Sequence, residues 1–124
     1  MAKSSIDVSG ADSKDKALTI GNFALEKKAE NVVILDMQEV SSFCNYFVIT
    51  GASSFKHTRA IAEHIEESLS KYKVEPHHIE GKEGGQWILL DYGDVVAHIF
   101  CEETRKFYDL ERLWGDAKQL KLNS

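Results

Sequence analysis

Residues 85–100, GQWILLDYGDVVAHIF, constrain the fold more than any other stretch of this chain. Two apolar runs flank Tyr92-Gly93, and a Gly-containing two-residue loop between such runs predicts a β-hairpin. This loop would place Asp91 opposite Asp94. Because side chains alternate along a strand, one side of the hairpin is entirely apolar, whereas the other mixes large apolar groups with ionisable ones.

The mixed side of the hairpin has two interpretations. The apolar side comprises Ile88, Leu90, Val95, Ala97, Ile99 and Cys101, and the mixed side comprises Trp87, Leu89, Asp91, Asp94, Val96, His98 and Phe100. The mixed side can be a second covered face, with His98 hydrogen-bonded under a helix and the aspartates at a solvated turn. It can instead be an exposed sheet face, since Trp and His beside acids on a rigid surface are typical of protein-binding patches.

The remaining sequence predicts helices and strands around this hairpin. The predicted elements are a helix over 12–29, strands at 31–37 and 44–51, a helix beginning at 54 or 55, a short strand at 77–81, strands at 86–91 and 94–101, and a last helix over 104–115. Asp12 or Ser13 can cap the first helix, and Ser53 or Ser54 the second. The second helix carries an apolar stripe of Ile61, Ile65, Leu69 and Tyr72, and Pro76 is expected to stop it.

This order of elements predicts a single α/β domain, with a mixed sheet of about five strands flanked by helices. A strand–helix–strand unit over 44–81 implies that part of the sheet is parallel. The domain is expected to span residues 12–117, between a flexible N-terminal tail over 1–11 and a C-terminal tail over 118–124.

Charge and hydropathy narrow the classes of partner. The net charge is −5 and the positive charges are scattered, which argues against direct grip on nucleic acid and suits a basic protein partner. No apolar run approaches the roughly 20 residues of a membrane span. The N-terminal residues lack the apolar region of a signal peptide, so we expect a cytoplasmic protein. Cys44 and Cys101 lie in apolar runs and are expected to be buried, reduced thiols.

Catalysis finds weak support. Asp91 and Asp94 could hold Mg²⁺ across their turn, with the TGASS loop at 50–54 cradling phosphate. However, no third carboxylate has a forced place beside them, and the loop lacks the Lys and spacing of a P-loop. The adjacent His77 and His78 point to opposite sides of a strand, which is poor for metal binding. We therefore expect no catalytic residues, no metal site and no cofactor.

Five segments resemble the ribosomal silencing factor family, RsfS, also called Iojap-like. They are NVVILDM, NYFVITGASS, TRAIAEHIEE, EGKEGGQWILLDYGDVVAHIF and ETRKFYDLERLWGDA, in the family's order and spacing over roughly residues 17–117. The resemblance implies a factor that binds large-subunit ribosomal protein fourteen at the subunit-joining face, sterically blocks the small subunit and represses translation during starvation. It also implies a nucleotidyltransferase-like fold without that catalytic motif, and a possible homodimer.

Two alternatives to silencing stay open. Family members of mitochondria and chloroplasts act in large-subunit assembly, so an assembly factor is one alternative. A nucleotidyltransferase-like enzyme that uses Asp91 and Asp94 is the alternative of another class.

The resemblance also suggests which residues bind the partner. The family's motif residues here are Trp87, Asp91, Gly93, Asp94, His98, Glu103, Arg105, Tyr108, Leu110, Glu111 and Trp114. From this motif and its strand we expect the partner-binding residues Trp87, Leu89, Asp91, Asp94, His98, Arg105, Tyr108 and Glu111. Trp87 would be the anchor, and the two aspartates with His98 would meet Lys or Arg.

Other motif positions have different expected roles. Arg105 and Glu111 could equally pair with each other, and Leu110, Leu113 and Trp114 are expected in the core. Many members carry an acid where this chain has Asn45, which keeps only hydrogen bonding.

Overall fold

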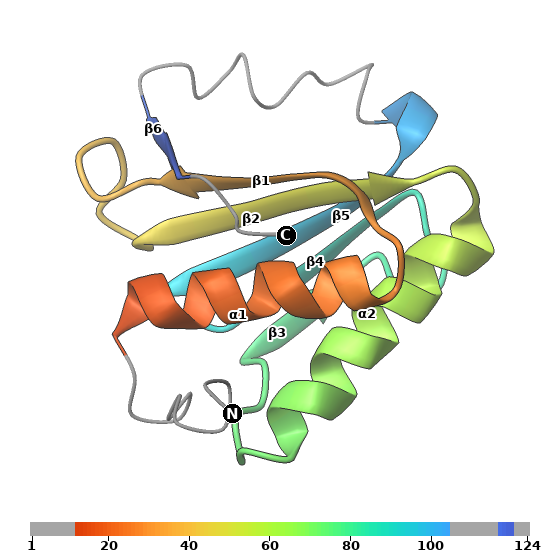
Figure 1. Ribbon diagram of the computed structural model, residues 1–124, viewed down its shortest axis with the longest axis horizontal. Coiled ribbons are helices and arrows are strands. Elements are labelled where there is room, and N and C mark those ends of the chain that lie inside the picture. The colour runs from red at the N-terminus through yellow and green to blue at the C-terminus, as the bar shows by residue number, and fades with distance from the viewer. Residues whose placement is uncertain (1–11, 105–116, 121–124) are drawn as a thin grey trace.

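Six strands form one mixed sheet in the spatial order β3-β4-β5-β2-β1-β6 (Figure 1). The computed structural model describes residues 12–104 and 117–120. Its elements are α1 (Ser13–Glu26), β1 (Glu30–Asp36), β2 (Tyr46–Ala52), α2 (Phe55–Ser70), β3 (His78–Glu80), β4 (Trp87–Asp91), β5 (Val95–Cys101) and β6 (Lys118–Leu120). Strands β2 and β5 pair in parallel, and the other neighbouring pairs are antiparallel. The predicted single α/β domain with a mixed sheet is confirmed.

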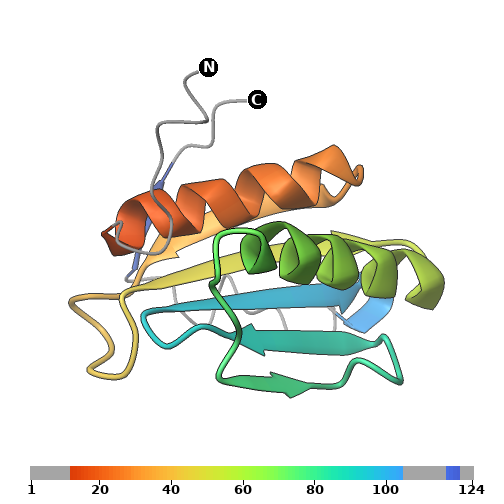
Figure 2. The same cartoon turned by 90° about the horizontal axis from the view of Figure 1, so that it is seen from below.

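Helices α1 and α2 lie on the same face of this sheet (Figure 2). Helix α1 begins after Asp12, whose carboxylate accepts a hydrogen bond from the Asp15 backbone N–H at 2.9 Å. Helix α2 begins after Ser54, whose hydroxyl oxygen accepts from the His57 N–H at 3.1 Å. Each cap satisfies an N–H that has no partner within the helix, so both helices start where the sequence predicts.

Helix α2 ends earlier than predicted. Its last residue is Ser70, and Lys73 then adopts a left-handed backbone with φ 64°. The helix has therefore ended before Pro76 can exert any effect. Tyr72 lies beyond the helix and is 39% exposed, so the buried stripe ends at Leu69.

The face of the sheet under the helices is the apolar side of the hairpin. Ile88, Leu90, Val95, Ala97 and Ile99 pack there against α1 and α2, each at most 1% exposed. Burying an isoleucine or leucine side chain fully contributes about 1.5–3 kcal/mol. This layer therefore buries one face of the sheet beneath α1 and α2.

The loop between β4 and β5 is Gly93-Asp94, one residue later than predicted. Tyr92 donates its N–H to Val95 at 2.9 Å, and Asp91 pairs with Val96 rather than with Asp94. Gly93 takes φ +90°, which a hairpin loop requires at its first position and which glycine adopts most easily. The pairing shifts by an even number, so the strand side chains keep their predicted faces.

The C-terminal part of the chain departs from the prediction in one respect. Lys118–Leu120 were assigned to a tail, but they form β6 and pair antiparallel with β1, with Asp36 opposite Lys118. This strand explains why the sheet has one strand more than expected. Residues 1–11 and 121–124, which complete the predicted tails, lie outside the described residues. So do residues 105–116, which include all but the first residue of the predicted last helix.

Candidate functional site

The second face of the sheet, opposite α1 and α2, is apolar and aromatic. Its buried side chains are Leu35, Met37, Cys44, Ile49 and Phe100, and its partly buried ones are Val33, Phe47, Trp87, Val96 and Ala117. This is the mixed side of the predicted hairpin, extended across β2 and β1. We call it the Trp87 face.

Four rings from three neighbouring strands meet on the Trp87 face. Trp87 of β4 stacks on Phe100 of β5, with ring centroids 4.8 Å apart and planes inclined by 30°. Phe47 of β2 meets His98 of β5 edge-on at 4.6 Å. The indole Nε1 of Trp87 donates a hydrogen bond to Nδ1 of His98 at 3.1 Å. The indole is therefore held by both stacking and a directional bond, and it remains partly exposed.

His98 lies beneath the surface and supports Trp87. His98 is only 5% exposed. Burial lowers the pKa of its imidazole to about 4, although the nearby Asp91 carboxylate acts to raise that pKa. The imidazole is therefore neutral near pH 7. Because Nδ1 accepts from the indole, the ring proton is assigned to Nε2, which is buried without a hydrogen-bond partner among the described residues.

Both interpretations of the mixed side hold in part. The covered interpretation fits His98, which is too deeply buried to meet Lys or Arg on a partner as expected. The exposed interpretation fits Trp87, Leu89 and Asp91, which follow one another along β4 on this face and are each partly exposed. Asp91 also accepts a hydrogen bond from the Gly93 N–H at 2.8 Å, which orders the turn beside it.

Asp94 does not lie on the Trp87 face, which corrects the predicted placement. Its two oxygens accept from Lys16 Nζ at 2.9 Å and from Ser13 Oγ at 2.8 Å, both at the start of α1. Burial acts to raise the pKa of Asp94, but these bonds outweigh it and the pKa lies below its ordinary value. The physical reason is the shifted loop: Asp94 is a loop residue, so strand alternation does not fix its direction.

Asn45 completes this network at the start of α1. Its Nδ2 donates to Ser13 Oγ at 2.7 Å, while the Ser13 hydroxyl donates to Asp94. The serine hydroxyl has one proton, so it needs a donor on its other side. Asparagine supplies that donor, whereas a carboxylate at position 45 could not and would repel Asp94.

The network removes the proposed metal pair. Asp94 is taken up by Lys16 and Ser13, and Asp91 belongs to the other face of the sheet. Within residues 12–104 and 117–120, no three His, Cys, Asp or Glu side chains are grouped to hold a metal ion.

Among the described residues, no helix is both long enough and apolar enough to cross a bilayer.

Sequence reasoning missed two exposed apolar residues in the loop between β1 and β2. Phe43 is 92% exposed and Val40 is 38% exposed. The available signal was an aromatic residue in a polar stretch, SSFCN, after one strand has ended and before the next begins. Of the predicted partner-binding residues, Arg105, Tyr108 and Glu111 lie outside the described residues, as do Leu110, Leu113 and Trp114.

Comparison with known proteins gives a consistent result. A sequence model of the family described as "Ribosomal silencing factor during starvation" matches residues 10–124. "Ribosomal silencing factor RsfS" of Halalkalibacterium halodurans is 40% identical over 97 residues, which cover 78% of this chain and 83% of that protein. "Mitochondrial assembly of ribosomal large subunit protein 1" of Mus musculus is 29% identical over 92 residues, covering 72% of this chain and 40% of the mouse protein.

The fold agrees with the sequence comparison. A crystal structure of a protein from Bacillus halodurans superposes with a TM-score of 0.76 and 35% identity, covering 86% of this chain and 98% of that one. The match of the family over nearly the whole chain, together with this likeness in fold, leaves one conclusion. The chain belongs to the ribosomal silencing factor family, RsfS.

Proposed function

We propose that the protein binds the large ribosomal subunit through its Trp87 face and silences translation during starvation. The observation that carries the proposal is the match of the family over residues 10–124. The docking partner is ribosomal protein fourteen, at the face where the small subunit must land. The bound domain keeps the two subunits apart by its bulk alone, so the mechanism needs affinity and no chemical step.

The geometry of the Trp87 face supports this role. Trp87, Leu89 and Asp91 present an aromatic, an aliphatic and an acidic group in one row along β4. His98 and Phe100 hold the indole from below, so little side-chain freedom is lost when it enters a pocket. The net charge of −5 favours approach to a basic ribosomal protein.

Subunit joining tests the proposal directly. Purified large and small subunits are mixed with and without the protein and separated on a sucrose gradient. We expect the joined-ribosome peak to fall as the protein saturates the large subunit, with the protein sedimenting in the large-subunit fractions. Undiminished joining at saturating protein would refute steric silencing.

Replacing the anchor tests the docking face. Trp87→Ala should weaken binding to large subunits by about 30-fold or more, because a central aromatic anchor typically contributes at least about 2 kcal/mol. Tyr72→Ala is the matched control, since Tyr72 is 39% exposed but lies past the end of α2. Circular dichroism shows whether a variant that has lost binding is still folded. If Trp87→Ala unfolds, Trp87→Phe replaces it in the test, because phenylalanine can still stack on Phe100. A folded Trp87→Ala variant with wild-type affinity would exclude this anchor.

An assembly factor for the large subunit is the second candidate. The observation that favours it is the mouse relative, whose name describes assembly of the mitochondrial ribosomal large subunit. Deleting the gene distinguishes the two roles. Accumulated precursor large subunits would indicate assembly, whereas mature subunits that stay joined during starvation would indicate silencing.

Catalysis is not part of the proposed function. Lys16 and Ser13 occupy Asp94, so the two aspartates do not present a joint metal site. Calorimetric titration with Mg²⁺ and nucleoside triphosphates should give no binding heat at millimolar concentrations. A saturable heat would reopen the enzyme alternative.

A further inference from the structure

We propose that the loop between β1 and β2 is a second docking element, in which Phe43 and Val40 form an apolar knob. The knob inserts into an apolar socket on a basic protein surface of the large subunit. This inference rests on the proposed function and adds residues outside the Trp87 face to the binding site.

Burial in the core does not account for the two side chains of the knob, because both are exposed. Phe43 is 92% exposed and Val40 is 38% exposed, the first being more exposed than any other large apolar side chain among the described residues. Burying a phenylalanine fully contributes about 1.5–3 kcal/mol, which this fold forgoes. A single exposed apolar residue is common on protein surfaces. The proposal therefore depends on how firmly the loop backbone is held and on what lies around it.

The backbone of the loop is ordered by hydrogen bonds and by burial on both sides of the knob. Met37 donates its N–H to Asn45 at 2.7 Å, Ser41 donates to Met37 at 2.8 Å, and the Phe43 N–H donates to Ser41 Oγ at 3.0 Å. Met37 is fully buried and Cys44 is 8% exposed. The loop therefore presents Phe43 in a fixed place, which lowers the entropy lost on docking.

The knob adjoins the Trp87 face. Met37 and Cys44, which flank the loop, belong to the same apolar cluster as Trp87. The N–H groups of Asn45 and Tyr46 donate to the Asp94 carbonyl at 2.8 and 3.1 Å, which ties the loop to the turn between β4 and β5. Both views show the loop and this turn at the same end of the sheet (Figures 1 and 2). One partner can therefore contact the knob and the Trp87 face together.

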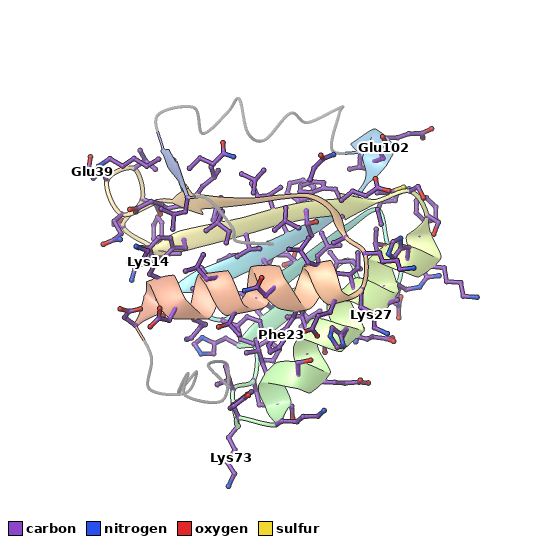
Figure 3. The ribbon with its side chains drawn as sticks, in the orientation of Figure 1. Lys14, Phe23, Lys27, Glu39, Lys73 and Glu102 are labelled. Carbon is purple, nitrogen blue, oxygen red and sulfur yellow. The ribbon has the colours of Figure 1, made fainter. Side chains whose placement is uncertain are left out.

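The charges at this end of the sheet define the partner as basic. The elements that meet here carry the acids Asp12, Asp15, Asp36, Glu39, Asp91 and Asp94 against the lysines Lys14, Lys16 and Lys118. Figure 3 shows Glu39 on the loop at this end, with Lys14 on the nearby start of α1. A second copy of the chain would bring two acidic ends together, whereas a basic surface complements them.

Two hollows lie next to the loop that carries the knob, and the first of them suits a basic partner. One of about 190 Å³ is lined by Asp36, Gln38, Glu39, Val40, Ala117 and Lys118. The other, of about 280 Å³, is lined by Asp12, Ser13, Lys14, Gln38, Asn45 and Tyr46. The first hollow has two carboxylates against one lysine, so its excess of negative charge suits a Lys or Arg side chain at the rim of an apolar socket, whereas the second has one carboxylate and one lysine.

The test is pelleting of the full-length protein with purified large subunits over a salt series. Phe43→Ser should lower the affinity by about ten-fold or more. Tyr72→Ser is the matched control, because Tyr72 is 39% exposed but lies just past α2, the helix on the opposite face of the sheet from Trp87, and its affinity should stay within about two-fold. Glu39→Lys should weaken binding mainly at low salt. Thermal unfolding confirms that each variant is folded.

The outcomes separate the inference from the function on which it rests. If the wild-type protein does not pellet with large subunits, the proposed function fails and the knob loses its partner. If the wild type pellets and Phe43→Ser pellets equally well, the inference is overturned and the proposed function stands. If light scattering shows that Phe43→Ser converts a wild-type dimer into a monomer that still pellets normally, the occupant is a second copy, and the inference is wrong.

Discussion

Acid should destabilise this fold through one buried side chain, His98. Burial lowers the pKa of His98 from 6.5 to about 4 in the folded protein, whereas the unfolded chain takes up its proton near pH 6.5. Above pH 6.5 neither state is protonated and the stability is complete. As the pH falls from 6.5 towards 4, only the unfolded state gains the proton, so stability is lost in this window.

The size of the effect follows from the width of that window. Each pH unit costs about 1.4 kcal/mol, so the free energy of unfolding should fall by about 3 kcal/mol between pH 6.5 and pH 4. Asp94, whose pKa is lowered, loses its contribution only below its ordinary pKa of 3.8. The two effects therefore occupy separate ranges of pH.

Urea unfolding followed by circular dichroism at several pH values measures this loss. His98→Gln removes the titrating group but keeps an oxygen that can accept from the Trp87 indole, so its stability should depend less on pH by about 3 kcal/mol across the window. Val40→Ala is the control, because Val40 is 38% exposed and does not titrate, and it should keep the wild-type pH dependence.

Two results would refute the reasoning. The first is equal pH dependence of wild type and His98→Gln between pH 6.5 and pH 4. The second is a His98 ring-proton resonance that titrates near pH 6.5 in the folded protein, which would show that the imidazole is solvated. Protonation of His98 in the folded protein, near pH 4, also removes the Nδ1 acceptor that holds Trp87, so binding to the large subunit should weaken only as the pH approaches 4.

Two further substitutions test residues that hold β4 in place. Tyr92 is 3% exposed, its hydroxyl has no hydrogen-bond partner among the described residues, and burial, then Glu66 and Glu75, raise its pKa. Tyr92→Phe should therefore leave the free energy of unfolding unchanged or raise it by about 1 kcal/mol in thermal denaturation, and a clear loss would reveal a missed partner. Gly81 has φ +76°, and an added Cβ would lie 2.0 Å from the Trp87 carbonyl oxygen. Gly81→Ala should lower stability by more than about 1 kcal/mol and shift tryptophan emission, and an unchanged melting temperature would contradict this.

The faces of the hairpin could be predicted because they depend only on alternation. Ile88 and Leu90 pack under the helices while Trp87 and Leu89 lie on the other face, as their order along the strand requires. The predicted loop was misplaced by one residue, and this error left the faces intact because the pairing shifted by two. Only Asp94 changed its surroundings, since a loop side chain follows no alternation.

Other features depend on contacts between distant parts of the chain. The burial of His98 requires Phe47 from β2 and Trp87 from β4 to meet beside it, which the sequence of β5 alone does not encode. Strand β6 has three residues and is recognisable only through its pairing with β1. The end of α2 is set by a left-handed Lys73, a conformation for which a lysine gives no sequence signal.

The parallel pairing of β2 with β5 explains how one rigid surface can include residues that lie far apart in the sequence. This pairing sets Ile49 beside His98 and starts both strands at the end where the loops meet. The Asp94 carbonyl then binds the start of β2, and the Asp94 carboxylate binds the start of α1, so the knob, the turn and the helix share one anchor. Docking such a surface orders few groups that were free before, so affinity can come from a modest contact area. A protein that acts by occupying space needs this property, because its effect lasts only as long as it stays bound.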